Sequence, residues 1–156
     1  MKTQRFYLDT SVFGGVFDKV FQADSIILFD ELSQGKFSAI YSSLTIKELV
    51  NAPQKVKKFF HQLPKEYVEM VDVPSDATHL AQAYIKEGVV GLTNFDDCIH
   101  IATATICNAN LLISWNFKHI VNVFRIRGYN FVNLKMGYQS IDIRSPKDVI
   151  GYETRN

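Results

Sequence analysis

The sequence predicts a three-layer α/β/α sandwich built on a parallel sheet of about five strands. Five short segments with strand character alternate along the chain with segments of helical pattern. Strands that alternate with helices in this way pair in parallel and are covered on both faces. The 156 residues suit one domain, and neither a repeat nor a linker divides them. We therefore expect one domain over 1–156, with 128–156 as a C-terminal extension packed on the body.

The strand segments are short and apolar, and the first helix between them has a clear periodicity. Residues 23–34 carry Ile27, Leu28 and Leu32 at helical spacing, and Gly35 follows as a C-terminal cap. The predicted strands cover 5–8, 37–42, 67–73, 111–114 and 140–144.

Capping residues and proline delimit the next two helices. Ser43 is expected to cap the helix that holds Glu48. Pro53 interrupts that helix before a basic helix over 54–61 begins. The helix that holds Glu48 is therefore short.

The last two predicted helices precede the fourth strand. Ser75 is expected to cap a helix over 76–87, which Gly88 closes. Asp96 is expected to cap a helix that runs through Asn108. Because the residues of this second helix are almost all apolar or small, we expect it to be buried.

Composition and charge exclude several classes of protein. With 47% hydrophobic and 21% charged residues, the chain has the composition of an ordinary globular domain rather than a disordered or fibrous one. The formal net charge of +1 indicates no particular partner, so any attraction to nucleic acid must come from a local basic patch. No apolar run approaches the roughly 18 to 20 residues of a membrane helix, and the chain enters a strand without a signal-peptide core. We therefore expect a cytoplasmic protein without a membrane partner.

Cys98 and Cys107 lie nine positions apart in one predicted helix. At the helical rise per residue they are ~13 Å apart, beyond the roughly 7 Å that a disulfide allows between Cα atoms. We expect both to be thiols that pack as small apolar side chains.

Three acidic residues stand at the ends of separate predicted elements. Asp9 ends the first strand, Glu48 lies on the helix after the second strand, and Asp97 opens the buried helix. In open α/β sheets, ligands gather outside the carboxyl ends of the strands. Mg²⁺ takes carboxylate oxygens and needs none of the His or Cys ligands that zinc prefers. The sequence therefore predicts a divalent-metal site at this edge.

Each acid also has a purely structural explanation. Asp9 could cap a turn or a helix, and Glu48 could be solvated and paired with a neighbouring lysine. Either Asp96 or Asp97 could cap its helix. Since two adjacent acids are not both needed as caps, Asp96, which comes first, suits the cap and Asp97 suits the cleft.

Further polar residues are expected near the same edge. His100 follows Asp97 by one turn, although a lone histidine in an apolar helix is more often a hydrogen-bonded core residue than a ligand or base. Ser114 ends the predicted fourth strand and Asn116 follows it, which leaves the end of this strand on the same edge as Asp9.

Four segments, in order, resemble the motifs of PIN domains: YLDTSV, TIKELV, DDCIHIATA, and a strand followed by SWNFKH. The PIN domain is the metal-dependent ribonuclease fold found in VapC-type toxins. The resemblance covers about 2–127 and extends to the closing strand in SIDIRSP. It implies a PIN-like parallel sheet of about five strands, with Asp9, Glu48 and Asp97 as acidic metal-site residues.

The activity that this resemblance implies is that of a Mg²⁺- or Mn²⁺-dependent endoribonuclease, the toxin of a type II toxin–antitoxin pair. A metal held by Asp9 and Asp97 polarises a phosphoryl oxygen and lowers the pKa of a bound water, which Glu48 orients or deprotonates. The residues expected around these acids are Thr10, Ser11, Asp96, His100 and Ser114.

Asn116 departs from the family pattern. PIN domains usually carry a fourth acid after the fourth strand, in a threonine, any residue, aspartate pattern, and here those positions are Ser114, Trp115 and Asn116. Asparagine can coordinate through its carbonyl oxygen but brings no charge. We expect Asn116 to take part in catalysis, with occupancy of a second metal left open and Asp96 partly replacing the missing charge.

Two basic stretches are candidate RNA contacts, and each could equally be an ordinary solvated face. An antitoxin protein and a second copy of the chain are further candidate partners. The candidate RNA-binding residues are Lys55, Lys57, Lys58, Lys118, Arg125 and Arg127.

Two other functions compete with the nuclease. The same fold with a weakened site could bind RNA or a protein without cutting, and Asn116 keeps this alternative open. A phosphohydrolase of the haloacid dehalogenase type would use Asp9 as nucleophile, but it needs a second aspartate where this chain has Ser11. Phosphate-binding glycine loops and zinc motifs are absent from the sequence.

Overall fold

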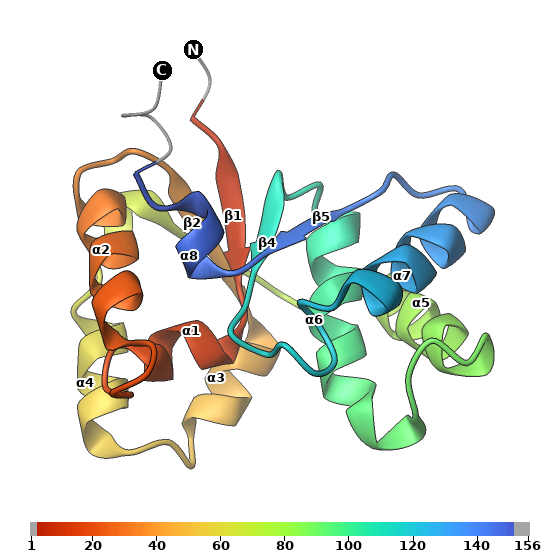
Figure 1. The fold of residues 1–156 in the computed structure, drawn as a ribbon, viewed down its shortest axis with the longest axis horizontal. Coiled ribbons are helices and arrows are strands. Elements are labelled where there is room, and N and C mark those ends of the chain that lie inside the picture. Colours follow the sequence, from red (N-terminus) through yellow and green to blue (C-terminus); the bar gives the residue numbers. More distant parts are fainter. Residues whose placement is uncertain (1–2, 152–156) are drawn as a thin grey trace.

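Five parallel strands form the central sheet of the computed structural model, which describes residues 3–151. The strand order is β3-β2-β1-β4-β5, so β1 is central (Figure 1). In the register of the sheet, Tyr7 of β1 lies beside Ile40 of β2 and Leu112 of β4. The strands are β1 (Arg5–Leu8), β2 (Ser38–Ser42), β3 (Val68–Val71), β4 (Leu111–Ile113) and β5 (Asp142–Arg144).

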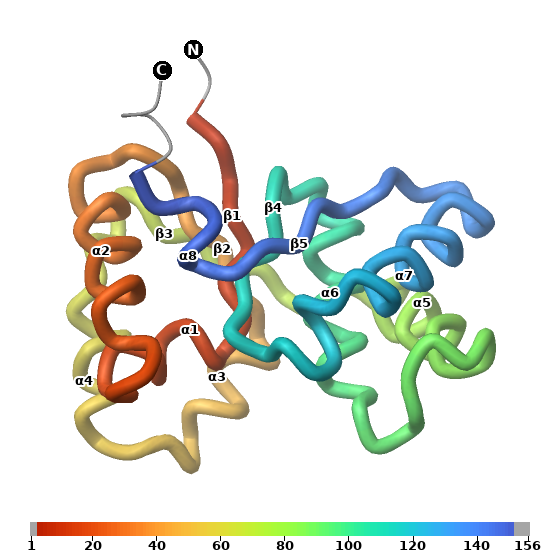
Figure 2. Tube along the Cα trace, viewed as in Figure 1, coloured from red at the N-terminus to blue at the C-terminus, as the bar shows by residue number. Residues whose placement is uncertain are grey.

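Helices connect the strands and cover both faces of the sheet. Figure 2 shows α1, α2 and α4 on one side of the strands and α5, α6 and α7 on the other. The helices of the described chain are α1 (Thr10–Gly15), α2 (Gln22–Ser33), α3 (Ser43–Leu49), α4 (Gln54–His61), α5 (Ser75–Lys86), α6 (Phe95–Ile106), α7 (Val123–Lys135) and α8 (Pro146–Val149), with 3-10 turns η1 (Lys65–Tyr67) and η2 (Leu92–Asn94).

Successive residues of the central strands pack into two separate cores, because side chains of a strand alternate between its faces. On β1, Tyr7 lies in the core that includes residues of α5, α6 and α7, whereas Leu8 lies in the core that includes residues of α1 and α2. Leu112 and Ile113 of β4 divide in the same way. The predicted α/β/α sandwich with a five-stranded parallel sheet is confirmed.

The predicted cap of the helix that carries Glu48 is wrong by one residue. The N-cap of α3 is Ser42 rather than Ser43. The hydroxyl of Ser42 accepts a hydrogen bond from the backbone N–H of Thr45, and the hydroxyl of Thr45 accepts one from the N–H of Ser42. This reciprocal capping box satisfies two N–H groups, which Ser43 could not do from inside the first turn.

The N-caps of the two later helices also precede the predicted ones. The N-cap of α5 is Pro74 rather than Ser75, and that of α6 is Asn94 rather than Asp96. Since η2 runs directly into α6, both Asp96 and Asp97 lie within the first helical turn instead of at its boundary. Neither acid is the cap, which removes the capping explanation for Asp97.

Helix α1 occupies the segment after Asp9, and Asp9 is its N-cap residue, although the side chain of Asp9 makes no capping hydrogen bond. It packs tightly, since a Cβ on Gly15 would lie 2.6 Å from Nε1 of Trp115. Residue 128, where the sequence suggested the start of an extension, lies inside α7, and β5 joins the sheet beside β4. The part of that segment from 152 onward lies outside the described residues.

None of the helices between residues 3 and 151 is long and apolar enough to cross a membrane. Cys98 and Cys107 are free thiols, as their spacing predicted.

Candidate active site

Asp9 follows β1 directly and is held by the sheet. Its backbone N–H donates to the carbonyl of Ile113 at the end of β4, at 3.1 Å. The side chain is only 5% exposed, and the hydroxyl of Ser11 donates to its Oδ1 at 2.5 Å. Burial raises the pKa of Asp9 to about 6, although His100, Ser11 and Ser114 act in the opposite direction. This carboxylate is therefore costly to keep ionised without a nearby cation.

Glu48 lies near the end of α3 and keeps its charge more easily. Its Oε1 accepts hydrogen bonds from the hydroxyl of Thr10 and from Nε2 of His100, both at 2.6 Å. Burial raises the pKa of Glu48, but the hydrogen bond and charge of His100 and the hydroxyl of Thr10 bring it below its ordinary value. Glu48 is therefore an anion at neutral pH.

Asp97, in the first turn of α6, is half-buried. Burial is the largest cause that raises its pKa, and repulsion from Glu48 adds to it, while His119 and His100 lower it. The amide of Asn116 donates to Oδ2 of Asp97 at 3.4 Å. Asp97 therefore resembles Asp9 in carrying a charge that its surroundings disfavour.

Asn116 is fixed at both ends of its side chain. Its Oδ1 accepts the backbone N–H of His119 at 2.9 Å, and its Nδ2 faces Asp97. The hydroxyl of Ser114 accepts the backbone N–H of Asn116 at 2.9 Å. In this arrangement Asn116 presents a donor to the acids, where the PIN-domain pattern has another carboxylate.

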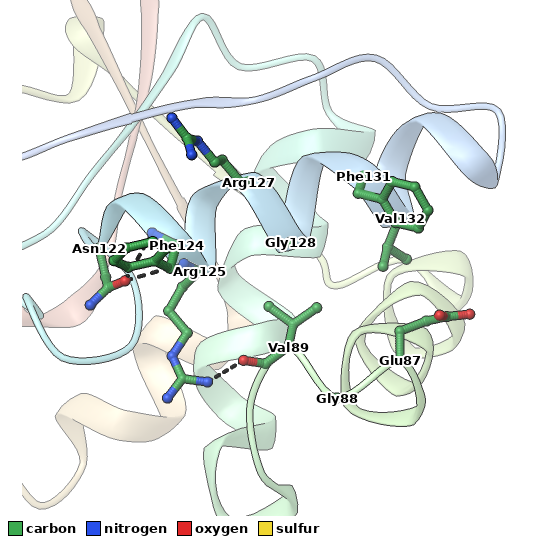
Figure 3. Close-up of a pocket in the computed structure, with 10 residues that line it drawn as sticks. All are labelled: Glu87, Gly88, Val89, Asn122, Phe124, Arg125, Arg127, Gly128, Phe131 and Val132. Atoms are coloured by element: carbon green, nitrogen blue, oxygen red, sulfur yellow. Dashed lines mark hydrogen bonds between the residues drawn. The ribbon is translucent and has the colours of Figure 1, made fainter.

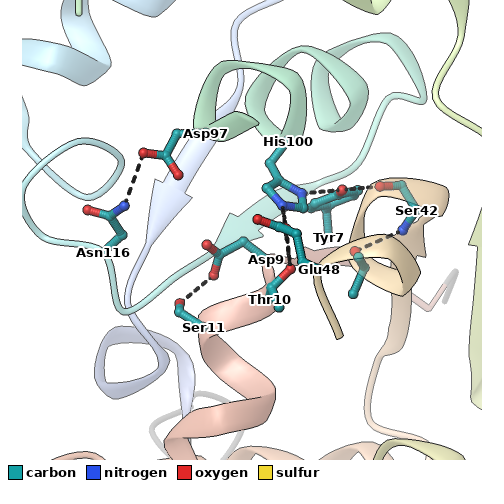
Figure 4. A network of polar contacts seen from close by, with 10 residues as sticks. Tyr7, Asp9, Thr10, Ser11, Ser42, Glu48, Asp97, His100 and Asn116 are labelled. Carbon is teal, nitrogen blue, oxygen red and sulfur yellow. Dashed lines mark hydrogen bonds and ion pairs between the residues drawn. The ribbon is translucent and has the colours of Figure 1, made fainter. Parts of the chain in front are cut away.

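The acidic residues face one region between the carboxyl end of β1 and helices α3 and α6 (Figure 4). Their charges act on one another, because Asp97 raises the pKa of Asp9 and Glu48 raises the pKa of Asp97. Among the surrounding residues predicted from the sequence, Thr10, Ser11, His100 and Ser114 bond to one of these acids. Asp96 is exposed instead.

The oxygen ligands at this edge suit a hard divalent cation. Within residues 3–151, no three or more His, Cys, Asp or Glu side chains are grouped so that they could hold a metal ion together. Mg²⁺, however, is commonly bound through one or two carboxylates and retains several waters. Asp9, a buried carboxylate whose hydrogen-bond donors are hydroxyl groups, and Asp97 fit such a cation.

Three residues at the site were not identified from the sequence. The hydroxyl of Tyr7 lies 2.7 Å from Nδ1 of His100 and 2.8 Å from the hydroxyl of Ser42. Tyr7 stands two positions before Asp9, and this strand spacing places both on one face of β1. His119, the largest influence lowering the pKa of Asp97, gave no sequence signal beyond its place in the loop after Asn116.

The candidate RNA-binding residues come from separate parts of the fold. Helix α4, with the first basic stretch, and helix α7, with Arg125 and Arg127, lie on opposite sides of the molecule (Figure 1). Lys55 stacks over the ring of Phe17, with Nζ 5.4 Å from the ring centroid. Arg125 and Arg127 line a cavity of about 760 Å³ along α7, where Arg125 donates to the carbonyl of Val89 (Figure 3).

Solved structures that share this fold include two toxin–antitoxin complexes. The crystal structure of VapBC2 from Rickettsia felis, bound to a DNA fragment from their promoter, matches with a TM-score of 0.57 and 15% identity, over 91% of this chain and 98% of that chain. FitAcB from Neisseria gonorrhoeae matches with a TM-score of 0.56 and 14% identity, over 92% and 99% of the two chains. No family model and no curated protein sequence matches the chain. At this identity the likeness concerns the fold, and it confirms the PIN-like architecture.

Proposed function

We propose that this chain is a Mg²⁺- or Mn²⁺-dependent endoribonuclease that hydrolyses phosphodiester bonds of single-stranded or structured RNA. The observation that carries the proposal is the buried carboxylate of Asp9 at the carboxyl end of β1, faced by Asp97 and Glu48. The charge of His100 and the nearby hydroxyl groups do not offset the burial of Asp9, because its pKa stays raised to about 6. A carboxylate that remains costly to ionise in this way is a candidate for binding a cation. The PIN-like fold agrees with this assignment.

Asp9 and Asp97 are the residues that would hold the metal. When bound, the metal supplies charge stabilisation for the phosphodiester and promotes ionisation of water at neutral pH. Glu48, whose pKa is below its ordinary value, is suited to orient the attacking water and accept its proton. The amide of Asn116 donates a hydrogen bond to Asp97. Because asparagine is neutral, the site carries less negative charge than it would with a fourth carboxylate.

RNA is expected to approach along basic residues near this edge. Lys118, two residues after Asn116 and exposed, is placed closest in sequence to the site. The basic residues of α4 and α7 would extend the contact on either side, so affinity for RNA should fall as salt rises.

A role as the toxin of a type II toxin–antitoxin pair is part of the proposal. It is supported by the sequence resemblance to VapC-type toxins and by the fold shared with chains of VapBC2 and FitAcB. An antitoxin protein is the partner expected on this basis, and a second copy of the chain is a further candidate.

One observation favours a second candidate function, a PIN-like module that binds RNA or protein without cutting it. Asn116 donates to Asp97 at the position where PIN domains usually carry an acid, which weakens the attraction for a second metal. This alternative predicts RNA binding without metal-dependent cleavage.

A cleavage assay on end-labelled RNA separates the two functions. We expect single-stranded RNA to be cut with Mg²⁺ or Mn²⁺, not to be cut in EDTA, and not to be cut by Asp97→Asn. Asp76→Asn is a matched control, since Asp76 is an exposed acid in the first turn of α5. RNA that binds but stays intact with both metals would reject the nuclease and favour the binding module.

A further inference from the structure

We infer that His100 and Thr10 are positioning residues that fix Glu48 at the site, holding one of its carboxylate oxygens and leaving the other to act on water. The inference rests on the proposed nuclease function and concerns how this chain, in particular, orients its third acid. It gives His100 a role that differs from both a metal ligand and an ordinary core residue.

Two donors converge on a single oxygen of Glu48. The hydroxyl of Thr10 and Nε2 of His100 each lie 2.6 Å from Oε1, and they lie 3.5 Å from one another. Hydrogen bonds to an ionised carboxylate are short and stronger than neutral ones. Oε2 receives no hydrogen bond from residues 3–151, so the two oxygens of this carboxylate have different tasks.

His100 is itself held from behind. Its Nδ1 lies 2.7 Å from the hydroxyl of Tyr7, which lies 2.8 Å from the hydroxyl of Ser42. Tyr7 and Ser42 are fully buried, and His100 is 2% exposed. A hydrogen bond on the far nitrogen fixes the orientation of an imidazole and the atom that it presents. Nε2 is therefore directed at Glu48.

The network also ties both ends of α3 to the rest of the fold. Ser42 is the N-cap of α3 and Glu48 lies near its last residue, while His100 comes from α6 and Tyr7 from β1 (Figure 4). Glu48, on α3, is thus placed by Thr10 of α1 and by His100 of α6, which Tyr7 of β1 holds in turn. Such support from surrounding residues is what holds a functional side chain in one geometry.

Kinetics distinguish positioning from simple packing. We expect His100→Leu to lower kcat on single-stranded RNA roughly 10- to 100-fold, the range for residues that orient a site from behind, with little change in KM. His100→Gln keeps a donor that can reach Glu48 and is expected to recover part of the loss. Thr10→Ser is expected to retain activity and Thr10→Val to lose some. His79→Leu, on the exposed surface of α5, is the control.

A double-mutant cycle tests whether His100 acts through Glu48. In a Glu48→Gln background, His100→Leu is expected to cause no further loss, because the carboxylate that it positions is already gone. Losses that multiply in the double variant would overturn the inference, since His100 would then act independently of Glu48.

Mn²⁺ titration gives a readout that does not depend on cleavage. Removing His100 leaves Thr10 as the remaining donor to Oε1 of Glu48 and takes away no oxygen ligand, so Mn²⁺ affinity is expected to stay unchanged or to tighten in His100→Leu even as kcat falls. General damage to the site would weaken metal binding and activity together, and this joint loss, not recovered by His100→Gln, would contradict the inference. If the wild type cuts no RNA with any metal, the nuclease proposal fails, but the Mn²⁺ titration still tests the positioning role of His100. Weaker Mn²⁺ binding in His100→Leu rejects that role, and unchanged or tighter binding supports it.

Discussion

The two ends of β1 carry charged residues in opposite environments. At the amino end, Arg5 donates to the carboxylate of Glu69 at 2.8 Å, and the two side chains are 36% and 49% exposed. At the carboxyl end, Asp9 is 5% exposed and hydrogen-bonded by hydroxyl groups rather than by a cation. The charge at the first end is paired and solvated, whereas the charge at the second end is buried at a cost to stability. Carboxylates whose pKa is raised in this way are concentrated at binding and catalytic sites.

The topology agrees with the proposed site at the carboxyl end of β1. From β1 the chain moves outward through β2 and β3, and it then returns to place β4 and β5 on the other side of β1. The order of the strands therefore reverses between β1 and β4. Ligands of open α/β sheets bind outside the carboxyl ends of strands at such a switch point, and Asp9 and Asn116 follow these two strands.

Among substitutions at the two ends of β1, a change at Asp9 is expected to have the largest effect, and that effect is on the rate of RNA cleavage. We predict that Asp9→Asn lowers RNA cleavage roughly 100- to 1000-fold, the size found when one group that stabilises transition-state charge is removed. RNA binding measured by fluorescence anisotropy is expected to remain. Cleavage at the wild-type rate in Asp9→Asn would show that the buried acid has another purpose.

The burial of Asp9 is also expected to appear in the pH dependence of stability. Its pKa is about 6 in the folded protein and ordinarily 3.8, so between these values the folded state binds more protons than the unfolded state. Stability therefore falls as pH rises through this window, and the full penalty, on the order of 3 kcal/mol, is present above pH 6. In EDTA, we predict that Asp9→Asn unfolds at higher denaturant concentration than wild type at pH 7.5 and at nearly the same concentration near pH 3.5. An equal difference at both pH values would contradict the assigned shift.

A substitution at Asn116 is expected to strengthen metal binding at the carboxyl end of the sheet. We predict that Asn116→Asp tightens Mn²⁺ binding roughly tenfold and increases cleavage, because another carboxylate strengthens the attraction for a divalent ion. Without metal the same variant is expected to be less stable, since a donor to Asp97 becomes a like charge. Calorimetric titration with a parallel cleavage assay measures both effects. Weaker metal binding together with lower activity would mean that the amide is already the better group at this position.

The smallest effect is expected at the amino end. We predict that Glu69→Gln changes the free energy of unfolding by less than about 1 kcal/mol, because exposed ion pairs contribute little. RNA cleavage is expected to be unchanged. A large loss of activity in this variant would erase the distinction between the two ends of β1.

The sequence predicts the strands and the acids for the same physical reason. Apolar runs that end in a charged or polar residue mark both a strand and the edge where it stops, so Asp9 and the segment around Asn116 could be placed on one edge. The contact between Tyr7 and Ser42 could not be predicted in this way, because it depends on the register between β1 and β2.

Helix α1 escaped prediction for a related reason. Thr10 and Ser11 have the local chemistry of a turn, and only packing of the glycine-containing α1 against neighbouring elements makes a helix there. The pairing of His100 with Glu48 joins residues that are 52 positions apart, so the pattern of α6 alone indicated a core histidine. Contacts between distant elements decide these cases.

We propose that Asp9, Glu48 and Asp97 act together as one metal-dependent hydrolytic site. The most direct test of this claim is a Mn²⁺ titration of metal-stripped protein in which bound metal and cleavage of a labelled single-stranded RNA are followed in the same buffer. We predict that cleavage rises with occupancy of the metal and that both are lost in Asp9→Asn. Cleavage that continues in EDTA, or metal binding that is unchanged in Asp9→Asn, would contradict the claim.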